Sequence, residues 1–504
     1  MKQADHQTRL LFLPDMFADY SAHEVRKRYK EHILDDIIPI CEDSDIIGIT
    51  LMTNYFAAAV EITQAIKRKM DIPVMWGGVH PTIRPEECLQ YADMVCIGEG
   101  EESTLELLNR MQRKEPYWDT KGFWFKRDGT IIRNSLRPLT YDLDDYPIPD
   151  YSLNDHYFIF EDKITKMTPK LMRIWFETTT LTVAEDFGMA GYNVLGEHFG
   201  MVVYTTLTGR GCPHKCTYCS NNFYNNLYDE QGYYRWRSTK HVISELQWVK
   251  DNVPNVRAIV FSDDTFFTRS LDIIEEFARN YKEIISLPFF CLGSPLDITE
   301  EKLALLVDAG LIGIQMGVQT ASIRLLEIFN RKMMSSDKTL KSMHTINKYK
   351  DRMKPPRYDF ILDFPYETPQ DKIETLKFIS KIPKPFRLNL FSMVFYPATK
   401  LYEMAKKDGF IKDETEDIYD NSFDRPREGY LNLLFELAQT GRFPAWLLRI
   451  MLSESLVLVL NNKMMRPFFK YFKIILKGIY HGSKWLSKLG KTNNKVSRDI
   501  YRTL

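Results

Sequence analysis

The run Thr208-Gly-Arg-Gly-Cys-Pro-His-Lys-Cys-Thr-Tyr-Cys-Ser220 places Cys212, Cys216 and Cys219 in the spacing C-x3-C-x2-C. Three thiolates this close suit three irons of a [4Fe–4S] cluster. An electron-transfer ferredoxin would add a fourth cysteine, which this run lacks. The spacing therefore predicts a cluster with one iron open to a small molecule. Two alternatives stay open here: a zinc site with a distant fourth ligand, and a chance group of buried thiols.

The motif directly follows a predicted strand, residues 201–206, and opens a series of alternating strands and helices that reaches about residue 400. Further strands are predicted over 256–262, 289–294, 310–319, 358–363 and 388–396. Six such strands suit a partial (β/α)6 barrel. In barrels of this kind the chemistry lies at the carboxyl ends of the strands, which is where the cysteine loop falls.

A second α/β pattern precedes the first one. Strands are predicted over 9–14, 45–51, 73–80 and 92–100, with helices over 23–42, 55–70 and 101–111. This alternation indicates a Rossmann-like parallel sheet covered on both faces, in which ligands bind at the carboxyl ends of the strands. Glycines at 77, 78, 98 and 100 fall at those ends, where they would let the backbone approach a bulky ligand.

Composition sets outer limits on the function. The chain has 504 residues, enough for two or three domains, with 44% hydrophobic and 27% charged residues and a net charge of zero, so no overall bias toward nucleic acid is expected. The seven cysteines form no disulfide-like framework, and a thiolate-bound cluster needs a reducing compartment. The polar first residues and the lack of a long apolar run lead us to expect a cytoplasmic protein.

Two segments fall outside these patterns. Residues 141–200 begin with an acidic, proline-rich stretch and continue as an aromatic-rich insert, which we interpret as a linker that covers the active site or meets a partner. Residues 463–504 contain eleven Lys or Arg residues against one acidic residue, Asp499, interleaved with large apolar side chains. This tail is typical of a helix lying on an anionic membrane, at the inner membrane face, or of a helix packed on the barrel with a solvated basic face.

The cysteine triplet, with an aromatic residue before its third cysteine, resembles the signature of the radical S-adenosylmethionine (SAM) enzymes. The resemblance implies that the open iron binds SAM and that the reduced cluster cleaves it to a 5′-deoxyadenosyl radical. It extends to the runs Phe261–Phe266, Gly317–Thr320, Phe364–Thr368 and Tyr396–Thr399. By the same resemblance, the residues near SAM would be Tyr218, Asp263, Asp264, Ser294, Gln319 and Arg331.

The N-terminal third resembles the cobalamin-binding domain that is fused to one large radical SAM class, on the runs Gly77–Thr82, Pro85–Glu87 and Gly98–Glu102. The D-x-H-x-x-G motif, whose histidine ligates cobalt in other cobalamin proteins, is absent, and we interpret His80 as a turn residue. The alternative is a Rossmann-like scaffold whose glycines only make turns. If cobalamin binds, the resemblance implies contacts from Thr50, Leu51, Met52, Gly77, Gly78, Val79, Glu99 and Gly100.

We therefore expect four parts: a cobalamin-binding-like domain (1–140), a linker and insert (141–200), a radical SAM barrel (201–412) and a helical C-terminal region (413–504). The expected reaction is reductive SAM cleavage, used for cobalamin-dependent methylation of an unactivated carbon. The alternatives are radical cyclisation or rearrangement without methyl transfer, or an iron–sulfur electron carrier or binding scaffold. The enzyme would need an external electron donor of the flavodoxin or ferredoxin type and would take an apolar or lipid-like substrate, with no nucleic-acid partner.

Overall fold

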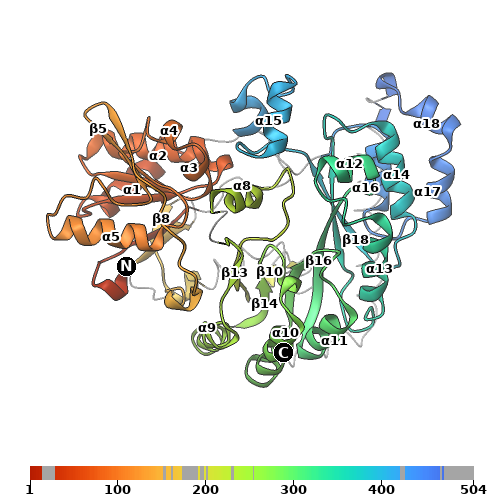
Figure 1. Ribbon diagram of the computed structural model, residues 1–504, viewed down its shortest axis with the longest axis horizontal. Helices are drawn as coiled ribbons and strands as arrows, with labels where there is room; N and C mark the ends of the chain where they lie inside the picture. The colour runs from red at the N-terminus through yellow and green to blue at the C-terminus, as the bar shows by residue number, and fades with distance from the viewer. Residues whose placement is uncertain are drawn as a thin grey trace.

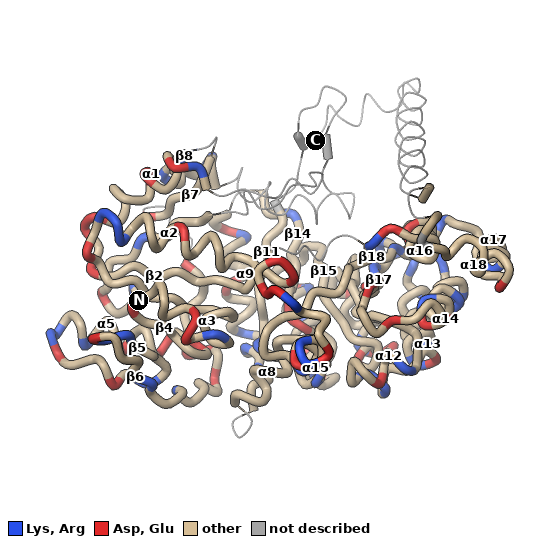
Figure 2. Tube along the Cα trace, turned by 90° about the horizontal axis from the view of Figure 1, so that it is seen from above, with Lys and Arg blue, Asp and Glu red and all other residues tan. Residues whose placement is uncertain are grey.

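The computed structural model describes residues 1–13, 29–150, 155–160, 163–172, 191–192, 198–199, 202–228, 232–253, 255–419, 426–465 and 468–469. An N-terminal α/β domain lies at one end of the molecule and a pair of C-terminal helices at the other, with a curved sheet between them (Figure 1). Seen from above, basic and acidic residues are interspersed along the trace, as the zero net charge leads one to expect (Figure 2). The predicted helix over 23–42 lies partly outside the described residues, and its described part is α1, Glu31–Cys41.

The central sheet has six parallel strands in sequential order, which confirms the predicted partial (β/α)6 barrel. Its strands are β11 (Val202–Thr206), β14 (Val256–Phe261), β15 (Phe289–Gly293), β16 (Leu311–Gln319), β17 (Arg357–Leu362) and β18 (Arg387–Ser392). The helices are α8 (Ser220–Leu227), α9 (Thr239–Asn252), α10 (Leu271–Asn280), α11 (Glu300–Ala309), α12 (Ile323–Ile328), α13 (Ser336–Asn347), α14 (Pro369–Ile379) and α15 (Lys400–Lys407).

Alternation along the strands gives the barrel two different faces. Ile259 and Phe261 pack into the large core beneath the helices, whereas Val203, Ala258 and Val260 gather in a separate apolar cluster on the concave side. Successive strand residues point to opposite faces, so the outer face is buried by helices and the inner face lines a lumen. The loops that follow the strands therefore all lie at the carboxyl rim of the barrel. The cysteine loop, which follows β11, lies at this rim.

The N-terminal sheet has the order β2-β3-β4-β5-β6. Its strands are β2 (Ile47–Thr50), β3 (Val74–Gly77), β4 (Met94–Cys96), β5 (Phe123–Arg127) and β6 (Thr130–Arg133), and its helices are α1, α2 (Phe56–Lys69), α3 (Val79–Ile83), α4 (Pro85–Cys88) and α5 (Glu101–Gln112). The first three strands are parallel, as predicted, but the antiparallel β5–β6 hairpin was not predicted. The prediction that placed the first strand, 9–14, in this sheet was wrong. That strand, β1 (Leu10–Phe12), pairs with β7 (His156–Phe160) in a separate sheet, which β8 (Lys163–Lys166) completes.

Short strands complete the linker region. The insert contains β9 (Gly191–Tyr192) and β10 (His198–Phe199), and β12 (Gly209–Arg210) in the cysteine loop pairs with β13 (Arg235–Trp236). The acidic linker carries the short helix η3 (Leu143–Asp145), in which the Asp142 side chain accepts a hydrogen bond from the Asp144 amide. The rest of residues 151–201 largely lies outside the described residues.

The C-terminal region is helical, as predicted, with η6 (Thr415–Tyr419), α16 (Tyr430–Ala438), α17 (Ala445–Met451), α18 (Glu454–Leu460) and η7 (Lys463–Met465). Residues 470–504, which include most of the basic tail, lie outside the described residues. Over the part of the chain that the structure describes, no helix is both long and apolar enough to cross a membrane.

Polar contacts join the N-terminal domain to the rest of the chain. On one side, the Glu99 carboxylate pairs with Arg210 and with the buried Arg235. The hydroxyl of Tyr228, the residue directly after α8, accepts a hydrogen bond from the Glu99 amide at 2.9 Å. On the other side, Arg84 donates to the Tyr402 hydroxyl of α15, which lies between the two domains in Figure 1. The carboxyl edge of the N-terminal sheet therefore faces the cysteine loop and the helix that follows it.

Candidate functional site

The three cysteines of the motif lie together in the loop between β11 and α8. Cys212 and Cys216 are buried, Cys219 is partly exposed, and all three are free thiols. The loop is held by a hydrogen bond from the Cys219 amide to the Cys216 carbonyl (3.2 Å) and by one from Asn225 Nδ2 to the Cys212 carbonyl (2.9 Å). Among the described residues no three His, Cys, Asp or Glu side chains converge on a single ion. A cubane does not need such convergence, because each thiolate binds a different iron.

The chemistry of these thiols fits a cluster. Burial raises the pKa of Cys212 to about 12 and that of Cys219 to about 11, and the charge of the neighbouring thiols adds to both shifts. Three thiolates gathered away from water would repel one another, whereas iron binding neutralises their charge and displaces their protons. Without metal, Cys212 and Cys219 therefore stay protonated near neutral pH, and iron binding would displace their protons.

Arg331 supplies positive charge next to this loop. Its side chain is 6% exposed, and Nη1 lies 3.3 Å from Cys216 Sγ and 3.3 Å from the Tyr218 hydroxyl, while Nη2 donates to the Gly317 carbonyl at 2.6 Å. Nε of Arg331 is buried and has no hydrogen-bond partner among the described residues. A buried donor without a partner is costly, so this nitrogen is available to an anionic group bound beside the cluster.

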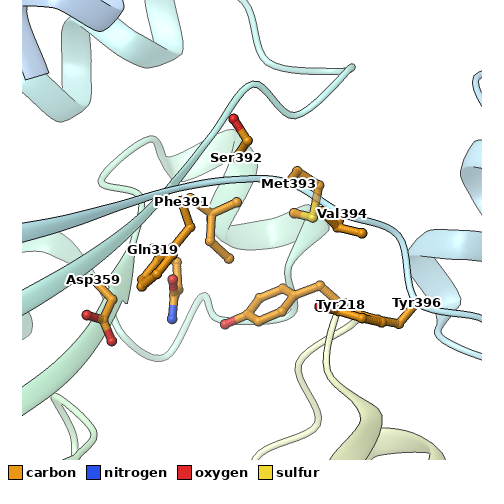
Figure 3. Close-up of a pocket in the computed structure, with 9 residues that line it drawn as sticks. Tyr218, Gln319, Asp359, Phe391, Ser392, Met393, Val394 and Tyr396 are labelled. Atoms are coloured by element: carbon orange, nitrogen blue, oxygen red, sulfur yellow. The ribbon is translucent and has the colours of Figure 1, made fainter. Parts of the chain in front are cut away.

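A cavity of about 290 Å³ opens beside the cluster loop. It is lined by Tyr218, Gln319, Asp359, Ile361, Phe391, Ser392, Met393, Val394 and Tyr396, most of which Figure 3 labels. Gln319 adopts a positive φ of 71° at a register shift of β16, and its amide lies over Gly317, where a Cβ would be 2.7 Å from Nε2. The absence of a side chain at Gly317 thus lets Gln319 turn toward the lumen.

The remaining residues predicted near SAM separate into two groups. Both oxygens of Asp263 accept hydrogen bonds from Thr208, and one also pairs with Arg269, so its carboxylate is already occupied by the barrel itself. Ser294 is buried and accepts a bond from the Leu296 amide at 3.5 Å, outside the residues that line the cavity. Asp264, in contrast, is exposed and close enough to Cys212 and Cys219 to raise the pKa of both thiols.

At the N-terminal sheet, the residues predicted to contact cobalamin lie along one edge. Thr50 and Met52 are exposed there, whereas Leu51 is buried and Val79 packs against a tyrosine cluster of the barrel domain, formed by Tyr224, Tyr228 and Tyr233. Gly78 has a φ of 101°, and a Cβ there would lie 2.8 Å from the Leu51 carbonyl. Gly77 and Gly100 flank Cys96, and the Glu99 carboxylate is held by two arginines. Thr50 and Met52 therefore remain open to a ligand at this edge, while the backbone of Gly77, Gly78 and Gly100 packs closely against neighbouring protein atoms.

The interpretation of His80 as a turn residue is corrected by the structure. His80 lies in α3, is completely buried, and contacts Thr53 Oγ1 through Nδ1 at 3.2 Å. Burial lowers the pKa of His80 to about 4, so the imidazole stays neutral inside the domain. A side chain enclosed in this way does not reach a ligand on the carboxyl edge.

Two family models match the chain. The Radical SAM superfamily model covers residues 206–379, and the B12 binding domain model covers residues 8–108. Among curated proteins, the uncharacterized methyltransferase PH0819 of Pyrococcus horikoshii is 26% identical over 78% of this chain and 78% of its own length. The bacteriochlorophyllide d C-8(2)-methyltransferase of Chlorobaculum tepidum is 22% identical over 88% of this chain and 82% of its own length.

Solved structures share the fold. The radical SAM methyltransferase TsrM from Kitasatospora setae, with cobalamin and a [4Fe–4S] cluster bound, aligns with a TM-score of 0.56 at 15% identity, over 80% of this chain and 78% of its own. The cobalamin-dependent enzyme OxsB aligns with a TM-score of 0.52 at 17% identity, over 75% of this chain and 49% of its own. This chain thus carries a B12-binding domain followed by a radical SAM domain, and its cofactors are a [4Fe–4S] cluster, SAM and cobalamin.

Sequence reasoning missed several residues of this site. Asp359, Gln315 and Asn389 form a polar group inside the lumen, and Arg210 and Arg235 fix the domain interface. The strand pattern held a usable signal for the first group, because Gln315, Asp359 and Asn389 interrupt otherwise apolar strands at positions that face the lumen.

Proposed function

We propose that this enzyme methylates an unactivated carbon of its substrate in a cobalamin-dependent reaction. When bound, the cluster delivers an electron to SAM, and cobalamin carries the methyl group. The observation that supports this most is the contact between the two cofactor domains, in which Tyr228, at the end of the helix that follows the cysteine loop, packs onto Gly98 and Glu99. An enzyme that only cleaved SAM would have no need to bring the B12-binding edge to the mouth of the barrel.

The residue roles follow from the same geometry. We propose Cys212, Cys216 and Cys219 as cluster ligands, and Arg331 as the group that places an anion of SAM beside the cluster through its unpartnered Nε. Tyr218 and Gln319 would contact SAM where the cavity meets the cysteine loop, which leaves the rest of that cavity to the substrate. Their common position around the lumen mouth supports this assignment, as does the family pattern.

Further SAM contacts are proposed for Asp264 and, less directly, for Ser294 and for Asp263, which holds Thr208 at the start of the cysteine loop. Cobalamin contacts are proposed for Thr50, Leu51, Met52, Gly77, Gly78, Val79, Glu99 and Gly100. We also propose the four-part division with boundaries at residues 140, 200 and 412. The B12 binding domain match lies within the first part, and the Radical SAM match lies within the third.

The test uses full-length protein purified without oxygen and loaded with iron, sulfide and hydroxocobalamin. With reductant and SAM it should form 5′-deoxyadenosine, and corrin absorbance should stay with the protein through gel filtration. A cell extract treated with SAM that carries a labelled methyl group should then yield a labelled small molecule. Corrin retention with SAM cleavage but no label transfer would favour cyclisation or rearrangement, and lack of corrin retention would reject the proposal.

Radical SAM enzymes need an external electron donor, and we propose a flavodoxin- or ferredoxin-type protein for this role. We also propose that the C-terminal region contacts the inner membrane face. The helices α17 and α18, at the far end of the molecule from the B12-binding domain, expose Trp446, Ile450, Leu458 and Val459 just before the basic tail begins (Figure 1). Exposed apolar groups next to Lys and Arg residues favour peripheral binding to anionic lipid.

Liposome flotation tests the membrane proposal. Full-length protein should bind vesicles that contain anionic lipid at low salt, and binding should weaken with added salt and vanish in a chain that ends at Asn462. Equal binding to neutral vesicles, or no binding at low salt, would reject it. A positive result would support an apolar or lipid-like substrate drawn from the membrane.

A further inference from the structure

The lumen of the barrel contains a carboxylate that none of the cofactor roles uses. Asp359 lies on β17 and lines the same cavity as Tyr218 and Gln319. Figure 3 draws these three side chains along one side of the pocket, beside the segment that carries Phe391 and Met393. Asp359 therefore faces the space next to SAM in which a substrate would meet the cofactors.

Neutral groups hold this carboxylate in place. Gln315 Nε2 lies 3.2 and 3.0 Å from its two oxygens, and Asn389 Nδ2 donates to Oδ1 at 2.8 Å. Among the described residues, no Lys, Arg or His forms an ion pair with Asp359. Arg357, two residues earlier on β17, acts on it only through its charge at a distance. Two amides from the neighbouring strands fix the orientation of the carboxylate without neutralising it.

Burial raises the pKa of Asp359 to about 6, against the lowering effects of the two amides and of the Arg357 charge. The group is therefore mostly ionised near neutral pH, and a charge in a partly desolvated cavity favours a cation that enters it. Phe391 and Ile361 line the same cavity with apolar surface.

We infer that Asp359 is the substrate-anchoring residue of the barrel and that it binds a positively charged nitrogen of a substrate whose remaining surface is apolar. Gln315 and Asn389 are positioning residues that aim the carboxylate. The inference builds on the proposed function only in that the substrate enters the cavity next to SAM. It does not depend on whether the reaction is methylation or cyclisation.

Equilibrium dialysis of cluster- and cobalamin-loaded full-length enzyme with SAM tests this inference. The probe is labelled benzylamine, which is a cation at pH 7.5, and its matched neutral probe is benzyl alcohol. Wild type should bind benzylamine at least tenfold more tightly than benzyl alcohol, and Asp359→Asn should lose this preference. The control Asp308→Asn changes an exposed carboxylate on the outside of the barrel that pairs with Lys282, and it should bind like wild type.

A second measurement uses wild type alone, so that it does not depend on how the variant folds. Benzylamine affinity should fall about fourfold between pH 7.5 and pH 5.5, as Asp359 takes up a proton. The charged and titratable groups around it are Arg357 on the same strand, Arg387 on the neighbouring β18, and Tyr218 and Tyr396 across the pocket. Arginine and tyrosine side chains do not titrate in this range.

Equal binding of the two probes, no binding of benzylamine, or a flat pH profile would each overturn the inference. So would a loss of SAM binding in Asp359→Asn, which would assign the carboxylate to the SAM site. Formation of 5′-deoxyadenosine and corrin retention by wild type are measured separately, so failure of the proposed function would be distinguishable from failure of this inference.

Discussion

Replacing Glu99 with alanine should weaken the docking of the B12-binding domain onto the barrel. The carboxylate contacts Arg235, whose side chain is only 6% exposed, and its second oxygen lies 3.1 Å from Arg210 Nη1. Removing one partner of a buried ion pair costs about 3–5 kcal/mol, because the other charge stays buried. Arg235 keeps the Thr140 carbonyl and Arg210 keeps Glu101, so we expect the lower end, about 3 kcal/mol. That is on the order of a 100-fold change in the docking equilibrium.

Hydrogen exchange measures this change directly. The Glu99 amide donates to the Tyr228 hydroxyl across the interface at 2.9 Å, so it is protected only while the domains are docked. In Glu99→Ala, exchange of the peptide that spans residues 97–100 should speed up by on the order of 100-fold, with β14 and β15 unchanged. The control Glu102→Ala alters an exposed carboxylate on α5 and should leave exchange at the wild-type rate. Unchanged protection of residues 97–100 in Glu99→Ala would refute the reasoning.

Three further predictions concern the cofactors and pH. Cys216→Ala should lose iron, sulfide and 5′-deoxyadenosine formation together, whereas Cys41→Ala should keep them. SAM cleavage by the Cys216→Ala variant would rule out the cluster assignment. Gly78→Ala should abolish corrin retention in gel filtration, because its Cβ would meet a backbone carbonyl. The control Gly129→Ala, also at positive φ but with nothing within 4 Å, should retain the corrin. Equal retention by the two variants would argue against the edge as the cobalamin site. Because burial lowers the pKa of His80 to about 4, the unfolded chain binds more protons than the native state between pH 6.5 and pH 4, so stability should fall by about 3 kcal/mol as the pH drops through that window. Urea titrations of His80→Leu should show a flatter profile there, and parallel profiles would contradict this account.

Local pattern was enough to predict the barrel strands and the cluster loop. Each of the six strands of the barrel was predicted within a few residues of its bounds, because parallel strands buried on both faces read as apolar runs. The β5–β6 hairpin was missed, since an antiparallel addition to a parallel sheet leaves no separate signal in the alternation of strands and helices. The partner of β1 was also missed, because pairing with β7 spans about 145 residues of sequence.

The sequence by itself predicted the radical SAM and B12-binding domains and pointed to three cysteines as cluster ligands, because C-x3-C-x2-C spacing is a local property of one loop. Only the tertiary structure decided what surrounds that loop. Arg331 comes 112 residues after Cys219 along the chain yet lies against Cys216, and Asp359 meets Gln315 and Asn389 only because three strands stand side by side. Contacts between residues far apart in sequence depend on strand order and register, which no single stretch of residues encodes.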